Sequence, residues 1–206
     1  MREIFELFPT PVVWCTGLVK PNLVRQLHEK FSNNFAQDNH HSQQLQHSLL
    51  MAQGADPGLD ALIEVVKPEI AHLGELLFGE ALDWNIKEAW FNFMEKGGQQ
   101  AVHNHANSFI SGVVYLTESH PSAHTRFIKS LGGRDFVFSN SNARSTVGAF
   151  SADKWVSPAP SPGDVVLFPS FLLHEVPTNQ GESRSTLAFN AVPTLLDAWG
   201  YKLHFS

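Results

Sequence analysis

Two histidines just before an apolar run are the residues best placed for chemistry. His103 and His105 stand two positions apart, and at this spacing side chains leave an extended strand on the same face. A third imidazole would complete a site for iron or zinc. His174 is the candidate, because its apolar neighbours in 171–176 offer few partners for its ring nitrogens. The sequence therefore predicts a metal site on His103, His105 and His174.

A pair of histidines can be part of a metal site or simply two polar residues on a strand, and the neighbouring residues help to distinguish these two interpretations. A Gly-Gly step at 97–98 precedes the pair, and a small polar bend at 106–108 follows it. In β-barrels, ligands often bind where a polar cluster at the strand ends opens into the mouth of the barrel. This context favours the metal site.

Arg184 indicates that an anion lies near His174. A turn centred near Asn179 predicts a hairpin in which His174 and Arg184 stand opposite each other, with Cβ atoms about 5 Å apart. An arginine inside a barrel is costly unless it meets an anion, and Thr186 on the same face adds a hydroxyl. No acidic residue of the hairpin faces it, so we expect a bound ligand to supply the anion. The alternative is that Arg184 points outward and pairs with Glu182.

Helical signals fill the first part of the chain. One helix is expected to begin at Pro21, and a second at Asp56-Pro57, where Asp56 is the N-cap. The second is expected to bend at Pro68 and to end at Gly79. The first helix carries an apolar stripe at every fourth residue, formed by Leu23, Leu27, Phe31 and Phe35.

Short strands dominate the rest of the chain. Residues 8–14 read as a proline-containing edge strand, and 37–49, with His40, His41 and His47, as a surface loop. Many short strands separated by Gly, Pro, Ser and Asn are typical of a β-barrel or jelly roll. We expect one domain over 1–206: a helical flank and edge strand in 1–80, and a double-stranded β-helix core, cupin-like, in 84–206. The candidate strands are 87–94, 100–105, 109–117, 124–129, 135–139, 147–149, 153–157, 164–168, 171–177 and 184–192.

Composition narrows the classes of partner. The 206 residues carry 14 Lys and Arg against 20 Asp and Glu, a net charge of −6, and no basic stripe suggests nucleic acid or an anionic membrane. There is no apolar run long enough to span a bilayer, and the N-terminus lacks a signal-peptide core. The single cysteine, Cys15, fits a reducing cytoplasm. Oligomeric state is not readable, and a homodimer is the commonest default.

The order of the motifs carries a family resemblance. A Phe-Pro-Thr-Pro-Val segment at 8–12 is followed by His-x-His, Ser-Gly-Val and Tyr-Leu within 103–116. Phe-Pro-Ser, His-Glu-Val, Arg-x-Thr and Phe-Asn then come within 168–190. This combination resembles the Fe(II)- and 2-oxoglutarate-dependent dioxygenases, and more closely a bacterial and phage group of 2-oxoglutarate–Fe(II) oxygenases. The resemblance implies a jelly roll that binds Fe(II) and 2-oxoglutarate.

The resemblance also implies roles for individual residues. His103 and His174 match the two iron-binding histidines. Arg184 matches the residue that salt-bridges the far carboxylate of 2-oxoglutarate, with Thr186 in support, and Tyr115 matches a tyrosine that hydrogen-bonds this carboxylate in related prolyl hydroxylases. The residues expected to line the substrate pocket are Trp90, Asn92, Asn107 and Asn190.

One position departs from the wider superfamily. Most members have Asp or Glu two residues after the first histidine, where this chain has His105. A third neutral imidazole would leave the iron with one more unit of positive charge. His105 is the expected third ligand, and Asn107 or water are the alternatives.

The implied activity is hydroxylation of an unidentified small molecule or peptide, with release of succinate and CO2. Two other functions are compatible with the same residues. A three-histidine cupin-type oxygenase would work without 2-oxoglutarate, and Arg184 would then bind the carboxylate of the substrate itself. A cupin-like binding module would have structural histidines and no catalysis.

Overall fold

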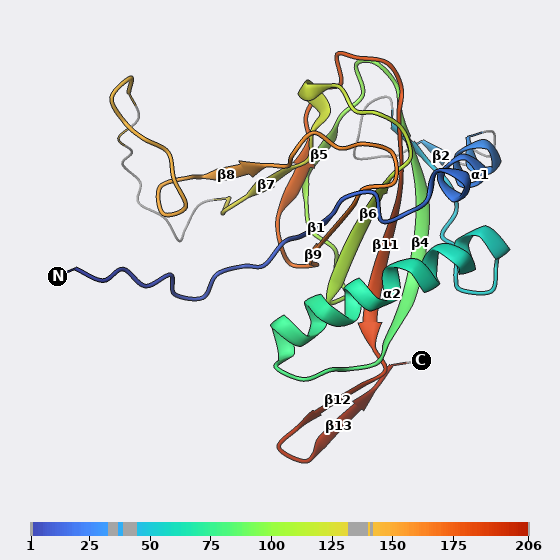
Figure 1. Cartoon of the computed structure of the whole chain (residues 1–206), viewed down its shortest axis with the longest axis horizontal. Helices are drawn as coiled ribbons and strands as arrows, with labels where there is room; N and C mark the ends of the chain where they lie inside the picture. Colours follow the sequence, from blue (N-terminus) through green and yellow to red (C-terminus); the bar gives the residue numbers. More distant parts are fainter. Residues whose placement is uncertain (1, 33–36, 39–44, 132–139, 141, 206) are drawn as a thin grey trace.

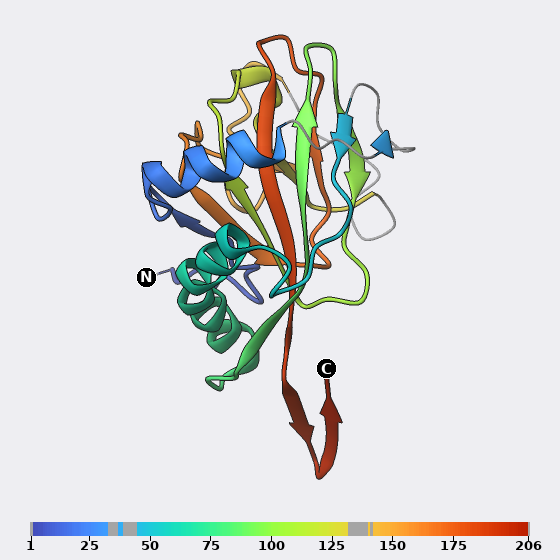
Figure 2. The same ribbon diagram turned by 90° about the vertical axis from the view of Figure 1, so that its right-hand side faces the viewer.

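Two facing β-sheets form the centre of the molecule, with two helices against the larger one (Figures 1 and 2). The computed structural model describes residues 2–32, 37–38, 45–131, 140 and 142–205. This architecture confirms the predicted jelly roll with a helical flank. The larger sheet has the order β1 (Val13–Cys15), β9 (Val165–Pro169), β6 (Ile110–Tyr115), β11 (Arg184–Pro193), β4 (Trp84–Met94), β3 (Leu45–His47), β2 (Gln37–Asp38). The smaller sheet has the order β5 (Gln100–His103), β10 (His174–Val176), β7 (Arg126–Ile128), β8 (Lys154–Val156).

Both helices begin where the sequence predicts, and α2 also ends at the predicted residue. Helix α1 (Pro21–Phe31) has proline at its first turn. Helix α2 (Pro57–Phe78) is capped by Asp56, whose carboxylate accepts the backbone N–H groups of Gly58 and Leu59 at 2.8 and 3.0 Å. It continues through Pro68 and ends at Gly79, which is left-handed with φ 71°. In the described part of the chain, no helix is long and apolar enough to cross a membrane.

The two faces of the larger sheet differ in chemistry. On the helix side, Val114, Leu187 and Phe189 belong to the main apolar core. On the opposite side, which faces the smaller sheet, strand β11 presents buried polar groups at alternate positions. Burying hydroxyls, amides and a guanidinium in this way is costly unless they find partners. The polar residues of β11 on this inner face, which need protein or ligand partners, are Arg184, Thr186 and Asn190.

Several strand predictions need correction or addition. The stretch 37–49 is not simply a surface loop, because β3 pairs with β4 and its Leu45 fills a small core with Met94 and Val176. Residues 147–149 form no strand. A terminal hairpin, β12 (Leu195–Ala198) and β13 (Tyr201–His204), was not predicted and extends away from both sheets (Figures 1 and 2). The strand predicted at 135–139, together with Phe35, His40 and His41, lies outside the described residues. Strand β1 lies at the sheet edge, but only 13–14 of the edge strand predicted over 8–14 belong to it, and residues 8–12 form no strand.

The predicted hairpin between His174 and Arg184 is wrong. Strand β10 pairs with β5 and β7 in the smaller sheet, whereas β11 pairs with β4 and β6 in the larger one. The link between them is held by Asn179, which is fully buried and exchanges backbone hydrogen bonds of 2.7 and 2.8 Å with Gly97 and Gly98. The chain therefore crosses from one sheet to the other instead of turning back on itself.

Candidate metal centre and anion site

Three histidines from two neighbouring segments converge between the sheets. His103 at the end of β5 stands directly opposite His174 at the start of β10, and their ring centroids are 4.2 Å apart. His105 follows in the loop, held by a backbone hydrogen bond of 2.9 Å to the carbonyl of Ser170. One ligand atom from each histidine lies within 4.8 Å of the others. The three predicted ligands are thus brought together.

Hydrogen bonds to backbone carbonyls fix the tautomers of His103 and His174, and Nε2 of His103 also lies 3.2 Å from the side-chain amide nitrogen of Gln100. Nδ1 of His103 lies 2.8 Å from the carbonyl oxygen of Ala101, and Nδ1 of His174 lies 2.9 Å from that of Leu172. A carbonyl only accepts, so each Nδ1 carries the proton and each Nε2 presents a lone pair. Nε2 of His105 and Nε2 of His174 are only 3.3 Å apart. Two lone pairs at that distance repel unless a proton or a metal ion lies between them.

The protonation state of the cluster also suits a metal. Burial, together with the neighbouring His103, lowers the pKa of His174 to about 3 and that of His105 to about 4. Burial also lowers the pKa of His103. All three rings are therefore neutral at neutral pH, the state in which imidazole binds metals. The three-nitrogen set fits a borderline ion such as Fe(II).

The alternative third ligand, Asn107, lies differently. It is exposed, at a left-handed turn with φ 56°. His105 instead directs its ring at the other two histidines, with ring centroids 5.2 Å from His103 and 5.1 Å from His174. This geometry favours His105 over Asn107 as third ligand.

Arg184 lies buried at the other end of the inner face. It is 4% exposed, which excludes the alternative of an outward arginine paired with Glu182. Its Nε donates to the hydroxyl of Ser119 at 3.2 Å, and its guanidinium carbon lies 5.3 Å from the ring centre of Tyr115. Among the residues that the structure describes, no Asp or Glu forms an ion pair with it. A buried cation without a carboxylate partner is a ready anion site.

Predicted partners of Arg184 lie beside it. Thr186 is directly opposite both Tyr115 and Asn92 in the sheet register, so the three share the inner face. The Tyr115 hydroxyl lies 3.0 Å from that of Thr125. The sequence prediction missed Thr125 and Ser119, because both lie in the 116–125 connection and no local pattern marks them.

A continuous interior links the two ends of the site. Tyr115, Phe127 and Phe168 belong to one apolar cluster between the sheets. The ring of Phe168 lies edge-on to His174 with centroids 4.7 Å apart, so the cluster extends from the anion site to the histidines. Trp90, a predicted pocket residue, stacks on the His105 ring with centroids 5.5 Å apart. The predicted pocket residue Asn190 is buried as well, on the same face of the sheet.

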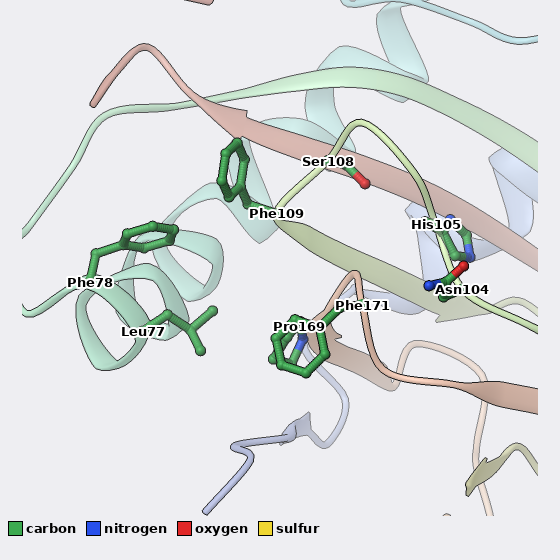
Figure 3. Close-up of a pocket in the computed structure, with 8 residues that line it drawn as sticks. All are labelled: Leu77, Phe78, Asn104, His105, Ser108, Phe109, Pro169 and Phe171. Atoms are coloured by element: carbon green, nitrogen blue, oxygen red, sulfur yellow. The ribbon is translucent and has the colours of Figure 1, made fainter. Parts of the chain in front are cut away.

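A cavity of about 270 Å³ opens beside His105 (Figure 3). Its lining carries no charged side chain, so it suits neutral groups. Figure 3 shows an apolar end near helix α2 and a polar end at the histidine. The apolar end is formed by Leu77, Phe78 and Phe109, and the polar end by Asn104, His105 and Ser108.

Comparisons with solved structures show the same fold. A prolyl-4-hydroxylase from Pseudomonas putida superposes with a TM-score of 0.62 at 16% identity, covering 88% of this chain and 92% of its own. HygX from Streptomyces hygroscopicus, solved with nickel and 2-oxoglutarate bound, gives 0.62 at 14%, covering 90% and 84%. The non-heme alpha ketoglutarate dependent epimerase SnoN from nogalamycin biosynthesis gives 0.64 at 14%, covering 90% and 80%. No curated protein matches the sequence.

A family model described as "Putative 2OG-Fe(II) oxygenase" matches residues 88–190. The match extends from β4 to β11 and contains His103, His105, His174 and Arg184. Because it spans half of the sequence and the fold agrees, this chain belongs to the 2-oxoglutarate–Fe(II) oxygenase family.

Proposed function

We propose that this oxygenase holds Fe(II) on Nε2 of His103, His105 and His174 and hydroxylates a C–H bond of its substrate. The observation that carries the proposal is the pairing of two features within one interior. Three neutral imidazoles each place a ring nitrogen within 4.8 Å of the others, and a buried guanidinium in the same interior forms no ion pair with a carboxylate among the described residues. A metal ion and a carboxylate ligand would satisfy both.

Arg184, Tyr115 and Thr186 would hold the far carboxylate of 2-oxoglutarate. The guanidinium offers two parallel N–H donors, a geometry that matches a carboxylate. The two hydroxyls, directly opposite in the register, add donors on the same face. The apolar rings of Phe127 and Phe168 would exclude water between this carboxylate and the iron.

Bound iron and 2-oxoglutarate supply the oxidation: one oxygen atom of O2 enters the substrate as hydroxyl, the other enters succinate, and CO2 is released. The protein contributes position and shielding. Trp90 and Phe168 contact the His105 and His174 rings and fix their orientation. Asn92, buried at 8% exposure beside Thr186, is placed to contact a bound cosubstrate or substrate.

Reconstitution with iron tests the proposal. Protein purified without metal should take up one Fe(II) per chain under anaerobic conditions. The single variants H103A, H105A and H174A should each weaken this binding by more than the roughly 10–100-fold typical of a change outside the ligand shell. N107A is the matched control at the same loop and should bind as the wild type does. Equal losses in N107A and H105A would contradict His105 as third ligand.

A titration with 2-oxoglutarate separates this reaction from the three-histidine cupin alternative. The proposal requires saturable binding of 2-oxoglutarate that depends on the metal, competition by N-oxalylglycine, and succinate release in air. Binding of iron without any binding of 2-oxoglutarate would favour the cupin alternative. Failure to bind iron or 2-oxoglutarate at all would favour a binding module and would overturn the proposal.

We also propose a cytoplasmic location. The support is the lone cysteine: Cys15 is partly buried, and burial together with the neighbouring Glu69 raises its pKa to about 11. Such a thiol stays protonated and unreactive at neutral pH. Fractionation of expressing cells tests this location, and recovery in a secreted fraction would contradict it.

A further inference from the structure

Asn190 is the centre of a buried hydrogen-bond network beside the metal site. Its side chain is 3% exposed. Its Nδ2 donates to Oε1 of Glu88 at 2.9 Å, and its Oδ1 accepts the hydroxyl of Ser111 at 2.8 Å. The Ser111 hydroxyl in turn lies 2.8 Å from that of Ser170. A fully satisfied polar network of this kind is rigid.

A β-bulge brings Glu88 into this network. Asn190 stands opposite Glu88, but the next residue, Ala191, stands opposite Ile86, so β4 has one extra residue at this point. The extra residue reverses the alternation along β4. Ile86 therefore joins the helix-side core, while Glu88 faces Asn190. Bulges often re-aim a side chain next to an active site.

The network holds His105 from several sides. The His105 backbone N–H donates to the Ser170 carbonyl at 2.9 Å, and Trp90, two residues from Glu88, stacks on the ring. A side-chain hydrogen bond also links His105 to Asn190. Glu88, Asn190 and His105 therefore form one continuous hydrogen-bonded chain.

We propose that Glu88, acting through Asn190, positions His105 and supplies to the metal centre the negative charge that a third imidazole ligand lacks. The inference rests on the proposed function, in which His105 is a metal ligand. Partners that hydrogen-bond a ligating histidine fix its orientation and raise its basicity. A carboxylate that is two hydrogen bonds away from the His105 ring stabilises the metal ion without binding it. Lys87 lies 3.5 Å from the same Oε1, but its side chain is 40% exposed, so water screens its charge.

Metal affinity and iron reduction potential test the proposal directly. E88Q keeps the shape of the side chain and removes its charge, and N190L breaks the link. Each should weaken Fe(II) binding by about 10–100-fold and raise the Fe(III)/Fe(II) potential, because less negative charge stabilises the ferric form. D197N is the matched control, since it also removes a carboxylate that pairs with a lysine, at 3.6 Å, far along the chain in β12. It should change neither quantity.

Two double variants distinguish a relay from a merely structural contact. If Glu88 acts only through Asn190, then E88Q/N190L should bind Fe(II) no more weakly than N190L alone. E88Q/N190D moves the charge one residue closer to His105 and should restore most of the lost affinity. Circular dichroism and the thermal midpoint of each metal-free variant verify that it is folded.

The outcomes separate this inference from the proposed function. If the wild type binds neither iron nor 2-oxoglutarate, the proposed function itself fails. If the wild type binds both but E88Q matches D197N in affinity and potential, the relay is refuted. Additive losses in E88Q/N190L, or no recovery in E88Q/N190D, would also refute it.

Discussion

Replacement of Arg184 by methionine should abolish tight binding of 2-oxoglutarate while leaving the metal centre intact. The guanidinium is 4% exposed and forms no ion pair within the described residues. Methionine fills similar volume without charge. The histidines lie beyond the Tyr115 and Phe168 rings, in the smaller sheet and its connecting loop, so their geometry should not change.

The size of the effect follows from the burial. Removing one partner of a buried, hydrogen-bonded charge pair costs about 2–5 kcal/mol, which corresponds to a Kd raised by about 30-fold to several thousand-fold. R184K keeps the charge but loses the two parallel donors, so its Kd should fall between those of the wild type and R184M. Without ligand, R184M should be no less stable than the wild type, because the charge it removes has no carboxylate to lose.

Calorimetric titration of 2-oxoglutarate into Mn(II)-loaded protein measures these affinities. R25M, at an exposed position of α1, is the matched control and should bind as the wild type does. In addition, 2-oxoglutarate at 100 times its Kd should raise the free energy of unfolding of the wild type by about 2.7 kcal/mol. The same concentration should leave the thermal midpoint of R184M nearly unchanged. Wild-type affinity in R184M would refute the assignment of the anion site.

Three further outcomes are expected. Burial lowers the pKa of His105 to about 4 and that of His174 to about 3, so below about pH 6.5 the folded metal-free protein binds fewer protons than the unfolded chain. The free energy of unfolding should therefore fall as the pH drops from about 6.5 towards these values, which equilibrium unfolding measures. Y115F should weaken 2-oxoglutarate binding by the roughly 1 kcal/mol of one hydrogen bond, with no change in Fe(II) affinity by calorimetry. G112V should lower the free energy of unfolding by about 1–3 kcal/mol in denaturant titrations, because a Cβ at Gly112 would lie 2.2 Å from the Phe189 ring.

Local rules in the sequence were sufficient for much of the site. The shared face of Arg184 and Thr186 follows from the alternation of side chains along a strand, whereas β5 ends at His103 and His105 lies in the loop that follows. The apolar neighbours of His174 marked it as a residue in need of a partner. The caps of α2 follow from Asp56 and Gly79 for similarly local reasons.

The tertiary structure alone decided which strands meet. His174 and Arg184 are only ten positions apart, yet they lie in different sheets, and the backbone of buried Asn179 in the link between them is hydrogen-bonded to Gly97 and Gly98. Spacing along the chain determines on which face a side chain lies, but not which strand lies next to it. That choice depends on packing across the whole sheet.

The position of Glu88 shows the same limit most clearly. By alternation alone, Ile86 and Glu88 should share a face, and only the bulge opposite Asn190 separates them. The sequence was therefore sufficient to identify which residues form the candidate centre, and local geometry indicated on which face of a strand a side chain lies. Their meeting, and the carboxylate behind His105, depended on long-range strand pairing, because the energy of that pairing is distributed over residues far apart in the chain.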